Sequence, residues 1–203
     1  SLVGSEMCIR DSFGKWNFPV IIDNMMNLEM LMWASKNSDN PKFAEIAKSH
    51  ADVTMKHHFR PDYSSYHVIS YDTISGQPEK KNTCQGYAHE SCWARGQGWA
   101  LYGYTMMYRF TKDRKYLEQA IKIAEFTLNH PNMPKDLIPY WDYNAPDIPN
   151  ALRDASAAAI NCSGLLELSQ YVSGEQAEKY YKAAEKMLQT LSSPAYTAEE
   201  GTN

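Results

Sequence analysis

A helical signature that occurs three times constrains the fold of this chain more than any other feature. A lysine followed by an aromatic residue, and then by small residues at helical spacing, occurs at Lys42-Phe43, Lys115-Tyr116 and Lys179-Tyr180. Each copy opens an amphipathic stretch that follows a more apolar stretch. The intervals accommodate a helical hairpin and a connecting loop, which is the organisation of helical repeat proteins.

The repeat predicts three helical pairs. We expect helices over 20–37 and 41–58, over 95–110 and 113–129, and over 155–171 and 175–191. The first helix, which Pro19 can start, is apolar nearly all round and should be buried; the second helix of each pair is amphipathic. Burial of the apolar helices gives an inner layer of parallel helices that begin on one face. The predicted fold class is therefore all-α, an incomplete α/α toroid with about three hairpins.

The connecting segments differ from the helices in composition. Residues 60–82 contain a β-favouring cluster around Val68 and Ile69 and then Gly76 and Pro78, which predicts a short hairpin or a structured loop. Residues 131–150 are rich in proline, which excludes a regular element there.

The first residues fit neither the repeat nor a targeting signal. Residues 1–12 lack the basic start and the apolar middle of a signal peptide, and they resemble a translated adaptor sequence. We expect residues 1–12 to be an extraneous, non-native segment and the domain to cover 13–203. Because no methionine starts it, we also expect that an upstream part is missing.

Charge and cysteine content exclude several functions. The net charge is -4 and no basic run occurs, so neither nucleic acid nor an anionic membrane is an expected partner. No apolar run reaches the ~18 residues of a membrane span. The scattered cysteines are expected to be free thiols. Cys84, His89 and Cys92 could ligate a metal, but they lack a fourth ligand at finger spacing, so neither a metal nor a cofactor is expected.

Residues 83–104 concentrate polar and aromatic side chains at the start of the second inner helix. Gln85, Arg95 and Trp99 lie there among four glycines. Glycine costs a helix roughly 1 kcal/mol relative to alanine, so these glycines serve either tight helix packing or an open helix entrance. Aromatic rings that stack on sugar faces and planar donors that pair with carboxylates favour the second explanation, a saccharide site.

Parallel inner helices would bring three ionisable residues together at their N-terminal ends: Asp23, Arg95 and Asp154. Helix capping is the alternative explanation for both aspartates. Asp23 lies among apolar residues, which would raise its pKa as a proton donor requires, whereas Arg95 and the helix terminus would lower it. The sequence leaves this balance open.

Four ordered motifs give a family resemblance. They are Phe-Pro-Val-Ile-Ile-Asp-Asn-Met-Met-Asn-Leu from Phe18, Tyr-His-Val-Ile-Ser-Tyr-Asp at 66–72, the segment from Gln85 to Tyr104, and Arg-Asp-Ala-Ser-Ala-Ala-Ala-Ile at 153–160. Together they resemble glycoside hydrolase family 88, the unsaturated glucuronyl hydrolases, over nearly everything after residue 13. The resemblance implies a six-hairpin α/α barrel, of which residues 13–203 would be a partial catalytic domain.

The resemblance also implies roles for individual residues. Asp23 matches the general acid/base of the family. His67, Gln85, Arg95 and Trp99 match positions that line the subsite for the unsaturated uronic acid. The second important aspartate of the family lies upstream of this chain, so no residue is assigned to it.

Family members release a 4,5-unsaturated uronic acid from the non-reducing end of lyase-generated oligosaccharides by hydrating its vinyl ether. The expected partner is therefore an unsaturated uronate-containing oligosaccharide of glycosaminoglycan type. Two alternatives stay open: an unsaturated rhamnogalacturonyl hydrolase with the same barrel and mechanism, and a non-catalytic helical-repeat module that binds a glycan or a protein. Activity is expected of the whole barrel rather than of this region alone.

Overall fold

The computed structural model describes residues 16–198. The segment 1–12 that we predicted to be extraneous, and the predicted start of the domain near residue 13, lie outside the described residues. Within them the order of elements is β1 (Phe18–Ile21), α2 (Asn24–Ser38), α3 (Pro41–His57), β2 (Val68–Tyr71), β3 (Pro78–Asn82), α4 (Ala94–Thr111), α5 (Arg114–Asn129), α6 (Ala155–Leu168) and α7 (Gly174–Leu191).

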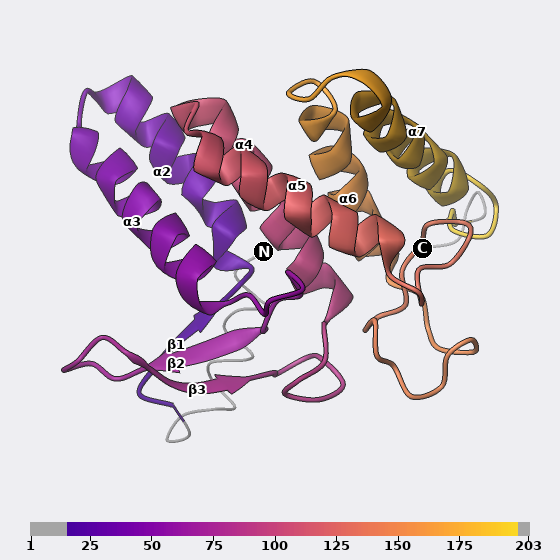
Figure 1. Cartoon of the computed structure of the whole chain (residues 1–203), viewed down its shortest axis with the longest axis horizontal. Coiled ribbons are helices and arrows are strands. Elements are labelled where there is room, and N and C mark those ends of the chain that lie inside the picture. The colour runs from indigo at the N-terminus through magenta and orange to yellow at the C-terminus, as the bar shows by residue number, and fades with distance from the viewer. Residues whose placement is uncertain (1–15, 199–203) are drawn as a thin grey trace.

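The helices form three consecutive hairpins, α2/α3, α4/α5 and α6/α7, in two layers (Figure 1). Helix α4 contacts α2 and α6, so α2, α4 and α6 form the inner layer, and each outer helix packs on the inner helix that precedes it. The inner helices all begin on the side where the small sheet and the long loops lie. The predicted arc of parallel inner helices and amphipathic outer helices is confirmed.

The repeated lysine-aromatic signature joins one outer helix to the next. Lys115 Nζ lies 2.8 Å from a carboxylate oxygen of Asp52 on α3, and the hydroxyl of Tyr116 donates to the same carboxylate at 2.9 Å. Lys179 and Tyr180 repeat this arrangement on Glu125 of α5, at 2.5 Å and 2.8 Å. The second and third copies of the signature therefore dock α5 and α7 on an acidic residue of the preceding outer helix.

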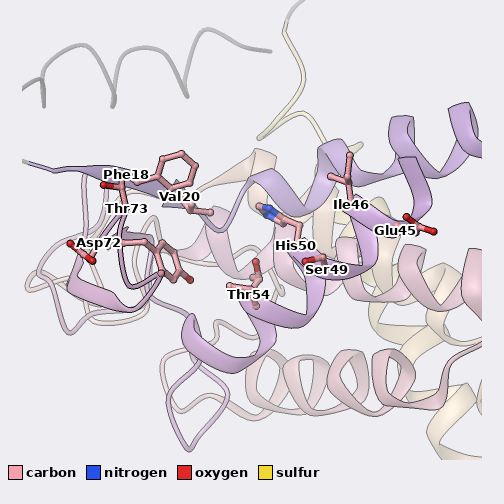
Figure 2. Close-up of a pocket in the computed structure, with 12 residues that line it drawn as sticks. Phe18, Val20, Glu45, Ile46, Ser49, His50, Thr54, Asp72 and Thr73 are labelled. Atoms are coloured by element: carbon pink, nitrogen blue, oxygen red, sulfur yellow. The ribbon is translucent and has the colours of Figure 1, made fainter. Parts of the chain in front are cut away.

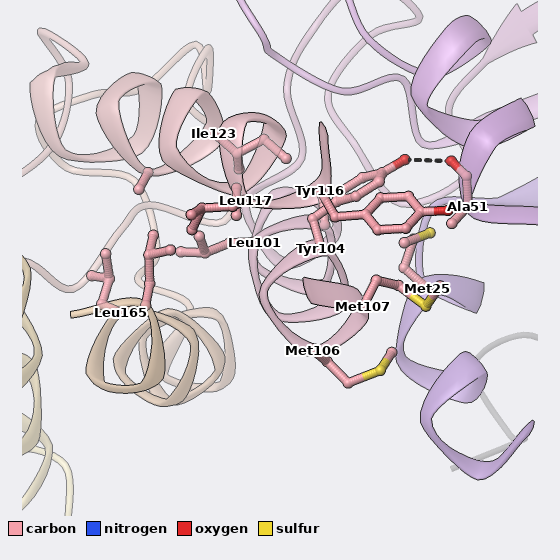
Figure 3. Packing of buried hydrophobic residues seen from close by; sticks show 14 of the residues in the cluster. Met25, Ala51, Leu101, Tyr104, Met106, Met107, Tyr116, Leu117, Ile123 and Leu165 are labelled. Atoms are coloured by element: carbon pink, nitrogen blue, oxygen red, sulfur yellow. Dashed lines mark hydrogen bonds between the residues drawn. The ribbon is translucent and has the colours of Figure 1, made fainter. Parts of the chain in front are cut away.

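Beneath these ion pairs, one continuous core fills the space between the layers (Figure 3). Tyr104 from α4 and Tyr116 from α5 are fully buried side by side, and the hydroxyl of Tyr104 donates to the carbonyl of Ala51 at 2.9 Å. Methionines and leucines of the inner helices surround them. This mixture of rigid rings and adaptable thioethers fills the core while the buried hydroxyl remains hydrogen-bonded.

A three-stranded antiparallel sheet, ordered β1-β2-β3, lies below the hairpin α2/α3. The hairpin predicted within 60–82 is confirmed as β2 and β3. The predicted start of the first helix at residue 20 is wrong. Val20 and Ile21 belong to strand β1 and pair with Ile69 and Val68 of β2. β-branched residues suit a strand, and Pro19 is tolerated because β1 is an edge strand. Helix α2 begins only at Asn24.

The prediction that the first helix is buried is wrong for one of its faces. Met25 and Leu28 are buried, but Met30 is 75% exposed and Trp33 is 59% exposed. Helix α2 contacts α3 and α4, whereas α4 has an inner helix on each side. Its remaining face therefore has no neighbour within residues 16–198.

The proline-rich segment between α5 and α6 has no helix and no named strand, as predicted. It joins the rest of the fold through isolated bridges, Trp93 with Asp142 and Tyr140 with Arg153. None of the helices in the described part of the chain is both long and apolar enough to cross a lipid bilayer.

Candidate active site

The N-terminal ends of the inner helices bring the predicted charged residues together. Asp23 directly precedes α2, Arg95 lies in the first turn of α4, and Asp154 directly precedes α6. Arg95 Nε lies 3.2 Å from Asp154 Oδ2, and the charge of Arg95 also acts on the pKa of Asp23. Three helices that are distant in sequence therefore build one ionisable cluster.

The two aspartates at helix starts have different surroundings. Asp154 caps α6, because its Oδ1 accepts the N–H of Ala157 at 2.9 Å and the hydroxyl of Ser156 at 2.6 Å. The side chain of Asp23 caps no N–H of α2 within the described residues, and its Oδ2 is buried there without a hydrogen-bond partner. Capping thus explains Asp154 and leaves Asp23 unexplained by a structural role.

Burial decides the protonation of Asp23. The residue is 7% exposed, and loss of hydration raises the pKa of its carboxyl group to about 6. A hydrogen bond to its own backbone and the positive charge of Arg95 lower that pKa by less than burial raises it. A carboxyl group of this kind can hold and deliver a proton near neutral pH.

His67, the residue before β2, faces Asp23. Its Nε2 lies 3.7 Å from Asp23 Oδ2. Its Nδ1 accepts the backbone N–H groups of Cys84 and Gln85, each at 3.2 Å, so Nδ1 is unprotonated and the ring proton is on Nε2. Burial, and secondarily Arg95, lowers the pKa of His67 to about 3. The contact is therefore a neutral N–H donor aimed at an acid and not an ion pair.

Two tryptophans flank this cluster. The ring of Trp93 stacks on His67 with centroids 4.4 Å apart, and the guanidinium carbon of Arg95 lies 5.1 Å from the same ring. Trp93 was not among the predicted site residues, although its position next to the start of α4 could have indicated it. Trp99 lies one turn after Arg95 on the same face of α4 and is partly exposed.

The two glutamines of this region have different surroundings. Gln85 is partly buried in the segment after β3, and its backbone N–H orients His67. Gln97 is fully buried; its side chain accepts the N–H of Ser65 and donates to the carbonyl of Tyr63, each at 2.9 Å. Gln97 therefore fixes the loop before β2 on α4.

Two further features do not extend the site. Cys84 is exposed and Cys92 is buried, both as free thiols, and no three potential metal ligands converge anywhere in residues 16–198. A groove of about 860 Å³ lies between α3 and the sheet, lined by Phe18, Ile46 and His50 among others (Figure 2). Its lining includes none of the predicted site residues, so it is separate from the ionisable cluster.

Known proteins resemble the chain over nearly its whole length. It is 53% identical over 188 residues to an unsaturated glucuronyl hydrolase of Formosa agariphila, covering 93% of this chain and 46% of that protein. An unsaturated chondroitin disaccharide hydrolase of Streptococcus pneumoniae is 36% identical over 87% of this chain and 45% of its own length. No protein-family model matches the chain.

A solved structure of an enzyme with the same name matches the fold of the chain. A crystal structure of an unsaturated glucuronyl hydrolase specific for heparin matches with a TM-score of 0.89 and 56% identity, covering 92% of this chain and 50% of that one. The three hairpins are an arc of the α/α barrel of these enzymes. The chain spans about half the length of the curated relatives it matches. As the four motifs predicted, it belongs to the unsaturated glucuronyl hydrolase family.

Proposed function

We propose that this region holds the proton donor of a glycosidase that releases a 4,5-unsaturated uronic acid from the non-reducing end of lyase-generated oligosaccharides. The observation that supports it most is Asp23: a buried carboxyl group with a pKa of about 6, free of any capping role and faced by a neutral histidine. Relatives that are named for this activity support the same proposal.

The chemistry requires one carboxyl group that first donates and then accepts a proton. Protonated Asp23 gives its proton to C4 of the C4=C5 double bond, and the ring oxygen stabilises the cation that forms at C5. The Asp23 carboxylate then takes a proton from a water molecule while the oxygen of that water adds to C5. The resulting hemiketal opens to a C5 ketone, and the hemiacetal left at C1 releases the rest of the saccharide as an alcohol.

The neighbouring side chains have roles that fit this reaction. His67 Nε2–H can donate to the Asp23 carboxylate after the first proton transfer, and a ring that stays neutral does not compete for the proton. Arg95, already fixed by Asp154, offers its remaining N–H groups to the uronate carboxylate. Trp99 would stack on the sugar, and Gln85 would bind its hydroxyls.

The substrate class is proposed to be glycosaminoglycan-derived. One relative is named for chondroitin disaccharides and one solved relative for heparin. Turnover of unsaturated heparin and chondroitin disaccharides should therefore exceed turnover of unsaturated rhamnogalacturonan disaccharide. The reverse order would favour the rhamnogalacturonyl alternative, and tight binding of all three without turnover would favour a binding module.

Asp23→Asn tests the proposal in the protein extended by the flanking regions that its relatives possess. We expect at least a ~10²-fold loss of kcat, because the amide cannot donate the proton, with the far-ultraviolet circular dichroism unchanged. Disappearance of the ultraviolet absorbance of the C4=C5 bond measures the reaction. The matched control is Asp39→Asn at the exposed C-terminal cap of α2, which should keep full activity. Turnover retained by Asp23→Asn would refute the assignment.

A further inference from the structure

Trp99 is connected to a polar cluster that the proposed reaction does not use. Its ring meets the ring of Tyr102 edge-on, with centroids 5.9 Å apart and planes at 85°. The two residues are three positions apart on α4 and so share one face of the helix. The hydroxyl of Tyr102 donates to Glu29 Oε2 on the neighbouring helix α2. Trp99 therefore rests against a ring whose far end is tied to another helix.

The connection continues to the third inner helix. Glu29 Oε1 accepts a hydrogen bond from Arg109 Nη2 at 2.7 Å, and Arg109 Nε lies 3.2 Å from Glu167 Oε1 on α6. The hydroxyl of Tyr171 donates to Glu167 at 2.9 Å. Each of the helices α2, α4 and α6 contributes a charged side chain, so the position of Glu29 depends on all three.

The protonation states favour a stable donor. Burial and the contact with Glu29 raise the pKa of Tyr102 to about 12, so its hydroxyl remains a donor at neutral pH. Burial lowers the pKa of Arg109, but its contacts with Glu167 and Glu29 together raise that pKa by more. The charged side chains of this cluster are between 20% and 37% exposed, which leaves their hydrogen bonds only partly screened by water.

A stacking surface for a sugar needs a ring held at a fixed orientation, because disorder of the ring must be lost on binding. Trp99 is only partly buried, and its ring contact with Tyr102 restrains one edge. Rotation of Tyr102 is in turn restrained by Glu29. We propose that Tyr102 and Glu29 are positioning residues that fix the indole of Trp99 for stacking on the substrate. This inference rests on the proposed function of Trp99 as a stacking residue.

The test follows the Trp99 ring directly. The chain contains five tryptophans, so labelling with 5-fluorotryptophan gives one ¹⁹F signal each, and Trp99→Phe identifies the signal of Trp99. We expect Tyr102→Phe and Glu29→Leu to shift and broaden the Trp99 signal selectively. Glu29→Gln keeps an oxygen that can accept the hydrogen bond of Tyr102, so its Trp99 signal should match that of the parent protein. Tyr181→Phe removes a hydroxyl from a half-exposed tyrosine on α7 and should change nothing.

A merely structural role would alter several tryptophan signals or the unfolding midpoint, and would leave Trp99 without a selective change; that result would overturn the proposal.

In the extended protein, Tyr102→Phe should raise KM about three- to tenfold and leave kcat nearly unchanged, as expected for one hydrogen bond. Addition of unsaturated disaccharide to the Asp23→Asn variant separates the two proposals. If Tyr102→Phe moves the Trp99 signal but the saccharide does not, positioning stands and stacking by Trp99 fails.

Discussion

Asp23 occupies the cap position of α2 without capping it. The residue is 7% exposed, so its charged carboxyl group loses hydration that neither its backbone hydrogen bond nor Arg95 restores. A residue that costs folding free energy at neutral pH and has no structural role is typical of a functional site. The loss of folding free energy that Asp23 causes can be measured independently of activity.

Asp23→Asn should stabilise the chain at neutral pH. The pKa of Asp23 is about 6 in the folded state against an ordinary value of 3.8, so between these pH values the unfolded chain loses its proton first and stability falls as pH rises. Well below pH 3.8 both states are protonated and the effect vanishes. The gain of the variant in unfolding free energy should therefore grow by about 2–3 kcal/mol from pH 4 to pH 7.5.

Urea unfolding at the two pH values measures this difference, with Asp39→Asn as the exposed control. Titration of His67 and the other histidines occurs in both proteins and largely cancels in the comparison. A stability difference that does not change with pH would show that Asp23 is not buried in its protonated form.

At the scale of elements, the glycines of α4 and α6 allow the inner helices to approach closely. A Cβ atom on Gly103 would lie 2.5 Å from Met25 Cβ of α2, and one on Gly164 would lie 3.1 Å from Leu101 Cγ of α4. The sequence offered tight packing or an open helix entrance as explanations for the glycines of α4. Tight packing explains Gly103, which lies in the interior of the helix.

Gly103→Ala should destabilise the chain by about 1–3 kcal/mol, even though alanine favours a helix by roughly 1 kcal/mol. The reason is that the added methyl group overlaps Met25 and pushes α2 away from α4. Chemical denaturation measures the loss. Ser163→Ala, at an exposed position of α6, should stay within ~0.5 kcal/mol. An alanine variant as stable as the parent would mean that the two helices separate easily.

At the scale of the whole molecule, the arc of three hairpins is packed most fully in its middle. Helix α4, with an inner helix on each side, buries most of its residues, whereas α2 is buried along one face only. Met30 and Trp33 lie on the other face and are exposed. Such exposure is unusual for large apolar side chains that are gathered on one surface.

Two methionines of α2 provide a matched pair for this asymmetry. Met25→Ala should cost about 2–5 kcal/mol, because Met25 is fully buried against α4. Met30→Ala should change the unfolding free energy by less than ~0.5 kcal/mol, because that side chain is 75% exposed. Urea unfolding of both variants measures the contrast. Equal costs would mean that another surface covers the exposed face in solution.

Much of the fold followed from the sequence because its determinants are local. Helical periodicity, caps and prolines act over a few residues, and they predicted the three hairpins, the β2/β3 hairpin and the irregular segment before α6. The spacing of the repeat then predicted parallel inner helices, and with them the meeting of Asp23, Arg95 and Asp154. The motifs identified the family, and the roles assigned to its site residues stay predictions that the variants above test.

The tertiary structure decided what depends on residues far apart in the chain. Strand β1 forms because Val20 and Ile21 meet β2, a pairing that no local pattern shows. Burial by the fold and the charge of Arg95 act together on the pKa of Asp23. The sequence neighbours of Asp23 therefore could not show whether that pKa is raised or lowered. The tie between Tyr102 and Glu29 likewise exists only where two helices cross. Local sequence thus determined the helical hairpins and the candidate acid, and packing determined strand β1 and the environment of Asp23.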